Sequence, residues 1–178
     1  MELRKTTACD VDAVMAIIEQ ARARIAQLGI DQWQGGYPNL QAIEGDVAAG
    51  KGYVAVDDLG GVCATAMVDH EGEPTYDELI NCSWLTDSTS ADPGYLVVHR
   101  VAVGDAGARR GLARFMLESV EEMARDRGYE SVRIDTHEGN VPMRSLLSKC
   151  GYEECGVIML SDPAEPTRER IAFEKRVR

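Results

Sequence analysis

The sequence predicts one α/β domain, and the stretch from Tyr95 to Tyr152 organises it. An apolar, β-branched strand from Tyr95 to Val103 is followed by a loop of small and basic residues and then by an amphipathic helix from Gly111 to Arg127. A second strand, Glu130 to Thr136, and a short helix continue the alternation. A chain of 178 residues can bury a substantial core in one domain, so we expect residues 1–178 to fold as a single unit.

The first half of the chain predicts an edge strand, two helices and a hairpin. An apolar stripe at helical spacing defines the first helix, and Gly29 is a natural stop for it. The turn residues Asp57 to Gly61 carry the hairpin signal. The expected elements are Glu2 to Thr6, Val11 to Leu28, Leu40 to Ala49, Gly52 to Val56 and Val62 to Val68.

The remaining segments are less regular. Tyr76 to Trp84 is compatible with a short strand or a helical turn, and Leu85 to Gly94 is a polar loop before the central strand. Gly156 to Leu160 and Arg168 to Lys175 are predicted strands, joined by the Pro-containing loop Ser161 to Thr167.

Composition narrows the class of protein. The net charge of −11 argues against nucleic acid or an anionic membrane as a partner. Neither a membrane-spanning run nor a signal peptide is evident, and the five cysteines contain no C-x-x-C motif, which favours a cytoplasmic protein with reduced thiols. The three histidines show no metal-ligand spacing, so we expect no metal.

The loop from Gly104 to Arg110 ends at the start of a helix, where unpaired backbone N–H groups and the helix dipole attract anions. Arg109, Arg110 and Arg114 add positive charge there, and Gly111 allows a close backbone approach. The spacing fits neither a Walker A loop nor G-x-G-x-x-G, so dinucleotide binding is disfavoured. The alternative is a tight turn with solvated arginines.

Three motifs together resemble the GCN5-related N-acetyltransferase (GNAT) superfamily over roughly residues 95–160: Arg109-Arg110-Gly111-Leu112-Ala113, then Asn140, then Gly151-Tyr152. The resemblance implies a mixed, mostly antiparallel sheet, splayed at its centre, with helices on both faces. It also implies acetyl-CoA as co-substrate. The implied acetyl-CoA-binding residues are Val101, Ala102, Val103, Arg109, Arg110, Gly111, Leu112, Ala113, Arg114 and Asn140.

The chain departs from the family pattern at two positions. Ala108 stands where the loop usually has Gln or Arg, which removes one side-chain contact to phosphate. Leu147 stands where a Tyr often serves as the acid for the departing thiolate, so that proton must come from water or another side chain. For Asn140, the alternative to holding the pantetheine arm is a plain N-cap.

His99 is the catalytic candidate. Strict alternation along the strand places Val97, His99, Val101 and Val103 on one face and Arg100 on the other, paired with a carboxylate. By resemblance, the backbone from Val101 to Val103 holds the pantetheine and the thioester, so His99 would serve as a base directly or through water. The alternative is a hydrogen-bonded core histidine.

The acceptor side is predicted from aromatic and acidic residues. Trp33 and Tyr37 lie in the segment that forms a wall of the acceptor site in the resembled superfamily. The alternative is that both rings fill the core under a loop. No Lys or Arg occurs between Gly52 and His99, whereas acidic residues are frequent there, which suits a cationic acceptor or ordinary solvated turns. Glu78 is the carboxylate we favour in this stretch.

The resemblance implies an N-acetyltransferase that moves the acetyl group of acetyl-CoA to a primary amine of a small molecule or peptide. Direct attack is expected, because Cys150 falls on the apolar face of its helix and is no acyl carrier. The alternative is a non-catalytic acyl-CoA-binding regulatory module. The sequence does not choose the amine, and a homodimer is expected only because paired subunits are common in the resembled superfamily.

Overall fold

The fold is built on one mixed sheet. The computed structural model describes residues 1–108, 110–161 and 167–178, and within these ranges the strand order is β1-β2-β3-β4-β5-β7-β6. Every pair of neighbours is antiparallel except β4 and β5. The strands are β1 (Glu2–Lys5), β2 (Gly52–Val56), β3 (Val62–Asp69), β4 (Tyr95–Val103), β5 (Ser131–Thr136), β6 (Glu153–Met159) and β7 (Glu169–Arg176).

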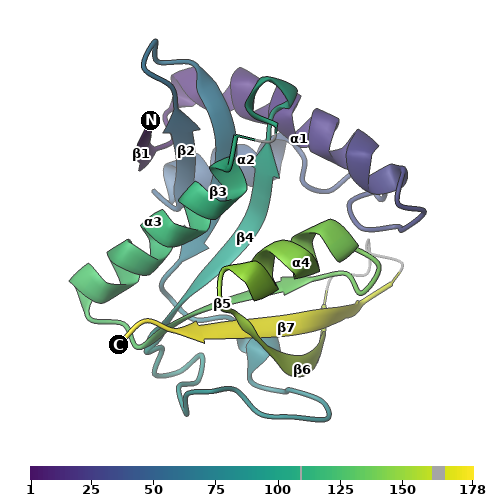
Figure 1. Cartoon of the computed structure of the whole chain (residues 1–178), viewed down its shortest axis with the longest axis vertical. Coiled ribbons are helices and arrows are strands. Elements are labelled where there is room, and N and C mark those ends of the chain that lie inside the picture. Colours follow the sequence, from purple (N-terminus) through teal and green to yellow (C-terminus); the bar gives the residue numbers. More distant parts are fainter. Residues whose placement is uncertain (109, 162–166) are drawn as a thin grey trace.

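Helices cover both faces of the sheet (Figure 1). On one face lie α3 (Leu112–Arg127) and α4 (Val141–Lys149), which bury the largest apolar cluster against β2, β3, β4 and β5. On the other lie α1 (Val11–Ala26) and α2 (Leu40–Ala48), packed on a second cluster that includes Val54 and Ala102. The predicted fold class, with helices on both faces of a mostly antiparallel sheet, is confirmed.

Most predicted elements are present, with shifted ends where tertiary contacts decide. Strand β6 begins at Glu153 rather than at Gly156, because a register shift next to buried Cys155 breaks the alternation. The ambiguous segment from Tyr76 to Trp84 forms neither a strand nor an α-helix. It contains the end of a short 3₁₀ turn, Pro74–Tyr76, and one isolated bridge from Ile80 to Val157.

The parallel strands β4 and β5 separate part-way along their length. They pair only from Tyr95 with Ser131 to Val98 with Ile134, although both strands continue further. Figure 1 shows the two ribbons fanning apart beyond this point. The predicted splay at the centre of the sheet is therefore present, and His99 is the first residue of β4 past the paired region.

A bulge in β4 overturns the predicted alternation of its side chains. In the pairing with β3, Thr65 lies opposite Ala102 and Met67 lies opposite His99. The single residue Ala66 is therefore opposite two residues of β4, Arg100 and Val101. Arg100 has a φ of 56° at this bulge. Before the bulge, Val97 packs with Tyr76 on the face away from α3. After it, Val101 and Val103 pack against the α3 cluster.

Strict alternation predicted that His99 shares a face with Val101 and Val103. The structure shows that it does not. It shares the face of Val97, and Arg100 lies on that side too, directed toward α2. The prediction failed because the extra residue of a bulge reverses every later side chain.

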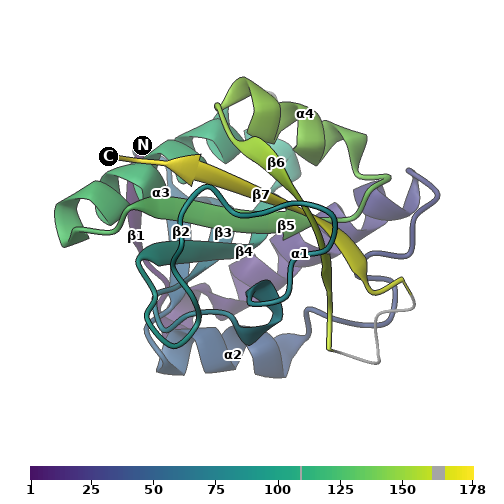
Figure 2. The ribbon, with the colours of Figure 1, turned by 90° about the horizontal axis from the view of Figure 1, so that it is seen from below.

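The segment between β3 and β4 crosses the sheet on the face away from α3 and α4 (Figure 2). A buried ion pair holds this segment in place. Nε of Arg133 on β5 lies 3.0 Å from Oε1 of Glu174 on β7, and both side chains are fully buried. Glu174 also accepts hydrogen bonds from Thr86 and from the backbone N–H of Leu85. Arg133 lies between the rings of Trp84 and Tyr95, at 4.3 and 3.9 Å from their centroids.

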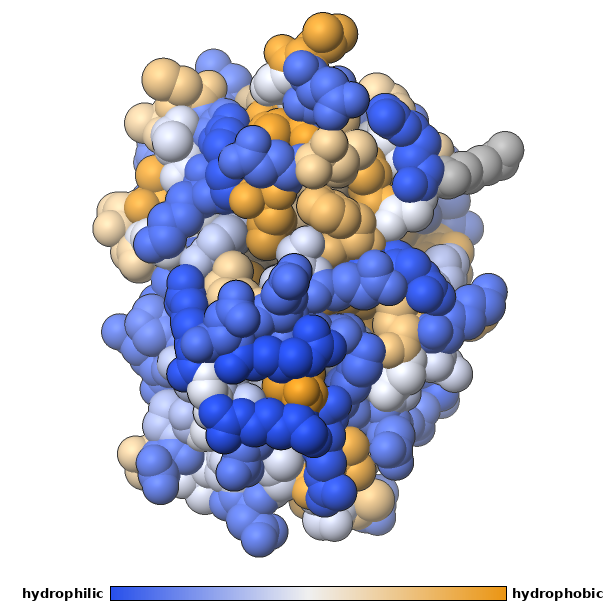
Figure 3. Space-filling view, turned by 60° about the vertical axis from the view of Figure 1, so that its left-hand side comes forward, coloured by the Kyte–Doolittle hydropathy of each residue, from blue (hydrophilic) through white to orange (hydrophobic). Residues whose placement is uncertain are grey.

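The outer surface is mixed in character. In the view of Figure 3, hydrophilic residues dominate the lower half, and apolar residues gather in the upper half. None of the described helices combines the length and apolarity needed to cross a bilayer. The five cysteines all lie in the described ranges and are free thiols.

Candidate active site

A cleft of about 350 Å³ opens where β4 and β5 separate, and it reaches both faces of the sheet. Val98 and Ile134, which belong to the α3 cluster, line it on one side, and His99 and Asp135 line it on the other. The outer walls come from the α1–α2 connection, the segment after β3, the start of α4 and the β6–β7 connection. Their lining residues are Gln32, Trp33, Tyr37, Glu73, Thr75, Asn140, Met143, Leu160, Ser161 and Arg170.

His99 stands between two carboxylates in this cleft. Its Nε2 is 3.5 Å from Oε2 of Glu73, and its Nδ1 is 3.8 Å from Oδ1 of Asp135. The side chain is 24% exposed, so it is neither sealed in the core nor free in solvent. A half-buried imidazole with one acidic oxygen near each nitrogen is suited to proton transfer at the cleft.

Glu73 is held from several sides. Its Oε1 accepts hydrogen bonds from the N–H and the hydroxyl of Thr75, at 3.1 and 2.7 Å, and its own N–H donates to the hydroxyl of Tyr95. Burial alone would raise the pKa of Glu73, but the hydrogen bonds from His99 and Thr75 outweigh it and lower the pKa to about 2. Glu73 is therefore a fixed carboxylate at neutral pH.

Asp135 is fixed by a buried phenol. The hydroxyl of Tyr76 donates to Oδ1 of Asp135 at 2.7 Å, and the Tyr76 side chain is fully buried. Burial, reinforced by the charge of Asp135, holds the pKa of Tyr76 well above that of an ordinary phenol, so the hydroxyl remains a donor. The bond from Tyr76 thus holds Asp135 in its orientation toward the cleft.

Arg100 links the bulge to the α1–α2 connection and to α2. Its guanidinium donates to both carboxylate oxygens of Asp46, at 2.9 and 2.8 Å, and to the hydroxyl of Tyr37 at 2.6 Å. The predicted pairing of Arg100 with a carboxylate is confirmed, although on the same side of the sheet as His99. Burial raises the pKa of Asp46, and the charge of Arg100 opposes that shift.

Trp33 and Tyr37 lie where the sequence placed them, on the cleft wall, and they also pack against the α1–α2 cluster. The core role offered for them is therefore present, whereas contact with the acceptor stays a prediction. Glu78 is different: it is exposed and is not among the residues that line the cleft. The acidic residue of this stretch that faces the site is Glu73, because the 3₁₀ turn at Pro74 directs it inward.

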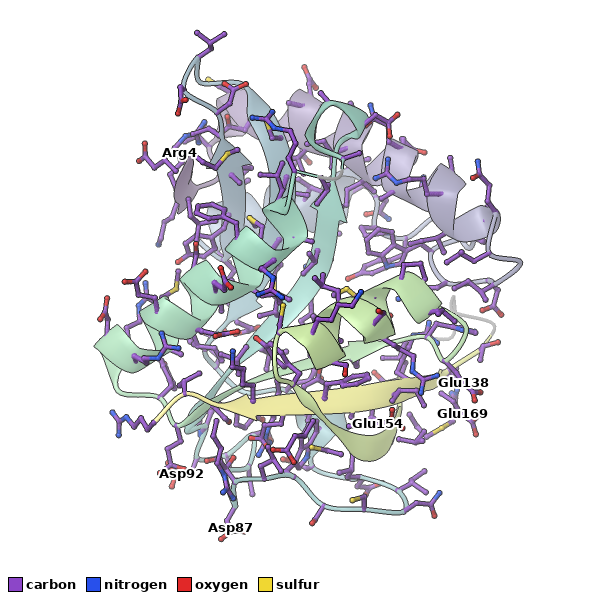
Figure 4. All side chains as sticks on the ribbon, in the orientation of Figure 1. Arg4, Asp87, Asp92, Glu138, Glu154 and Glu169 are labelled. Atoms are coloured by element: carbon purple, nitrogen blue, oxygen red, sulfur yellow. The ribbon has the colours of Figure 1, made fainter. Side chains whose placement is uncertain are left out.

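The rest of the acidic stretch is largely occupied or solvated. Asp69 and Glu71 both pair with Lys51, and Asp77 accepts from Ser90. Asp87 and Asp92 are exposed and point outward in Figure 4. Ordinary turn and surface roles therefore explain most of these charges. Among the described residues, no group of acidic, His or Cys side chains is arranged to hold a metal ion.

The basic loop reaches α3 in the way the sequence indicated. Gly111 has a φ of 76°, a left-handed conformation that favours glycine, and no described side chain caps the helix N-terminus. Arg110 and Arg114 are exposed, whereas Leu112 is buried and anchors the turn. Ala113 is half-buried in the first turn. Arg109 lies outside the described residues.

Asn140 begins α4 as an N-cap, accepting from the N–H of Met143 at 3.3 Å, and its amide also donates to Gln32 at 3.0 Å. It lines the cleft as well. Leu147 is fully buried and has no proton to give. Cys150 is buried and burial raises its pKa, so it is unsuited to carry an acyl group.

A model of the GNAT acetyltransferase family matches residues 23–152. The chain belongs to this family. GNAT acetyltransferases use acetyl-CoA as their co-substrate, and this chain is a GNAT acetyltransferase by both sequence and fold. No curated protein sequence matches it.

Solved structures agree with the family assignment. A GNAT-family acetyltransferase from Streptococcus agalactiae 2603 is 35% identical, with a TM-score of 0.86, over 98% of this chain and 94% of that one. A GNAT-family acetyltransferase from Listeria monocytogenes 4b F2365 is 15% identical, with a TM-score of 0.72 and the same coverage. A ribosomal-protein-alanine N-acetyltransferase from Brucella melitensis is 19% identical, with a TM-score of 0.66 over 99% of both chains. The last two show likeness of fold alone.

Sequence reasoning missed Glu73, Tyr76 and Asp135. Asp135 lies in a strand that the sequence predicted, but its place beside His99 follows from the register in which Tyr95 pairs with Ser131, and the structure alone supplies that register. Glu73 and Tyr76 carried no local signal either, since the irregular segment that holds them is placed by tertiary contacts.

Proposed function

We propose that this protein transfers the acetyl group of acetyl-CoA to a primary amine by direct attack, with His99 accepting the proton. The observation that carries the proposal is the cleft through the splayed strands. It brings a histidine and two fixed carboxylates to the separation of β4 and β5 on one face, and it opens to the α3 and α4 side on the other.

Acetyl-CoA supplies an activated acyl carbon. The basic loop at the start of α3, with Arg110, Arg114 and the N–H groups of the first turn, is suited to its phosphates. Arg109 belongs to the same proposal by sequence. Backbone from Val101 to Val103 beyond the bulge, and Asn140 opposite, would hold the pantetheine arm. Trp33 and Tyr37 would wall the acceptor.

The reaction balances without a protein acyl carrier. The amine nitrogen forms a bond to the acetyl carbon, the C–S bond breaks, and the nitrogen loses one proton to His99. The departing thiolate takes a proton from solvent because Leu147 offers none. A thiol ionises near about pH 8.5, so its thiolate is a tolerable leaving group.

The test measures release of free thiol from acetyl-CoA over a panel of primary amines, with calorimetry of acetyl-CoA binding beside it. His99→Ala should lower kcat/KM by about 10²–10⁴-fold and leave acetyl-CoA affinity nearly unchanged. His70→Ala is the matched control, because His70 is exposed and outside the cleft. An unchanged rate in His99→Ala would remove the base from this proposal.

The regulatory alternative gives a different result. A protein that binds acetyl-CoA but releases no thiol with any amine of the panel would be a binding module instead. Failure of acetyl-CoA to bind the wild-type protein would contradict both functions.

A further inference from the structure

The surroundings of His99 restrict where its proton can lie. A neutral imidazole has one N–H and one accepting nitrogen, whereas a carboxylate only accepts. Glu73 faces Nε2 and Asp135 faces Nδ1, so a neutral His99 can satisfy only one of them. The other nitrogen and its carboxylate oxygen then face each other as two acceptors, which favours a donor between them.

Glu73 is the better partner for the ring N–H. It is the nearer of the two, at 3.5 Å against 3.8 Å, and its Oε1 is engaged by Thr75, which leaves Oε2 toward His99. The hydrogen bond from His99 is one of the causes that lower the pKa of Glu73. An N–H on Nε2 directed at Glu73 leaves Nδ1 as the accepting nitrogen.

The gap between Nδ1 and Asp135 is where β4 and β5 come apart. Both residues lie just past the last paired positions of the two strands, and both line the cleft. An ammonium nitrogen at a usual charge-assisted distance of about 2.8 Å from each acceptor can bridge Nδ1 and Oδ1. The neighbouring Arg100 does not compete, because Asp46 and Tyr37 bind its guanidinium.

We propose that Glu73 is a positioning residue that keeps the proton of His99 on Nε2, and that Asp135, held by Tyr76, binds the ammonium form of the acceptor beside the free Nδ1. This inference rests on the proposed acetyl transfer and narrows its substrate to protonated alkylamines, in preference to neutral arylamines. The ammonium gives one proton to Nδ1 and then attacks as the free amine, and Asp135 balances its charge until that proton moves. His99 passes this first proton to solvent. The nitrogen loses its second proton as the C–N bond forms, to the freed Nδ1, and the departing thiolate takes a proton from solvent.

The tautomer can be measured without any activity. In ¹⁵N-labelled protein, two-bond ¹H–¹⁵N correlations distinguish an N–H on Nε2 from one on Nδ1, and His99→Ala assigns the signals. His137 is an internal reference, because its Nδ1 accepts from the N–H of Gly139 at 2.9 Å and any N–H of the neutral ring must lie on Nε2. We expect the same pattern for His99. A proton on Nδ1, or a ring still doubly protonated at pH 8, would overturn the assignment.

Glu73→Gln is the decisive variant, because Thr75 controls how the new amide turns. The two donors of Thr75 retain the amide oxygen, so the NH₂ group faces Nε2 and drives the ring proton to Nδ1. We expect an inverted tautomer and a kcat lowered about 10²-fold or more. Glu78→Gln, on an exposed side chain outside the cleft, is the matched control. A folded Glu73→Gln protein with the wild-type tautomer and kcat would contradict the positioning role.

Asp135→Asn tests the acceptor. The KM of alkylamines should rise by about 10–100-fold, as expected for loss of a hydrogen bond between charged groups, with little change for neutral arylamines. An equal effect on both classes would refute the ammonium site. If no amine is acetylated at all, the proposed function fails, whereas the tautomer measurement still decides the role of Glu73.

Discussion

Replacing Glu174 by Gln should destabilise the whole fold, because this buried carboxylate joins three separate parts of the chain. Its two oxygens accept from Arg133 and Ser131 on β5 and from Leu85 and Thr86 in the crossing segment, at 2.5–3.2 Å. Gln keeps the shape but turns an NH₂ group toward donors on one side, whichever way the amide is placed. It also leaves the charge of Arg133 buried without its partner.

The expected cost is about 3–5 kcal/mol of unfolding free energy, the usual range when one member of a buried ion pair is removed. In a chain of this size each 1 kcal/mol lowers Tm by roughly 2–4 °C, so Tm should fall by about 6–20 °C. The ring faces of Trp84 and Tyr95 on Arg133 soften the loss only in part.

Urea unfolding followed by circular dichroism measures this cost. Glu154→Gln is the control, since Glu154 lies on the neighbouring strand β6 with an exposed side chain paired to Arg144 (Figure 4), and it should change stability by less than about 1 kcal/mol. A Glu174→Gln variant as stable as this control would show that the crossing segment does not depend on the buried carboxylate.

Three further outcomes are expected. Arg110→Ala should weaken acetyl-CoA binding by about 1–3 kcal/mol in calorimetry, as loss of a charge-assisted hydrogen bond does, and unchanged affinity would remove Arg110 from the phosphate site. Asn140→Ala should cost about 1 kcal/mol of stability in thermal melts through its lost cap, and a parallel loss of acetyl-CoA affinity would reveal a ligand contact as well. The pKa of Glu73 is about 2, below its ordinary value, so its stabilisation is complete above about pH 4.5 and is lost as pH falls toward 2. Urea titrations from pH 5 to 3 should therefore show a shallower acid loss in Glu73→Gln, and equal slopes would contradict this.

Local patterns predicted the framework of the fold well. Three short-range signals are the stripe that ends at Gly29, the hairpin turn after Val56 and the glycine at the start of α3. The hairpin turn and the glycine of α3 lie directly at element ends, and α1 ends at Ala26, three residues before Gly29. They succeed because spacing and turn chemistry fix them within a few residues of sequence.

The side-chain arrangement inside the cleft could not be predicted in this way, because it depends on pairing between residues that are far apart in the sequence. The bulge at Arg100 is defined only by the partner strand, and an arginine with a φ of 56° gives no warning in the sequence. The choice of Glu78 over Glu73 failed for a related reason: the bonds of Glu174 to distant residues set the path of the crossing segment. His99 was chosen because its residue type suits the chemistry, and it does line the cleft, although its face was predicted wrongly. Its role as the base stays a prediction.

The hydrogen bonds of Arg100 to Asp46 and Tyr37 have a consequence for engineering the acceptor preference. These contacts join Arg100, at the bulge of β4, to Tyr37 in the α1–α2 connection and to Asp46 on α2, so the three parts are coupled. The connection is the part that we propose as the acceptor wall. Grafting a foreign α1–α2 connection to change acceptor preference would succeed only where the graft keeps the hydroxyl of Tyr37 and its register with Asp46 of α2. A transplant that dropped either would release a strained arginine at the centre of the sheet and disturb acyl-donor alignment together with acceptor choice.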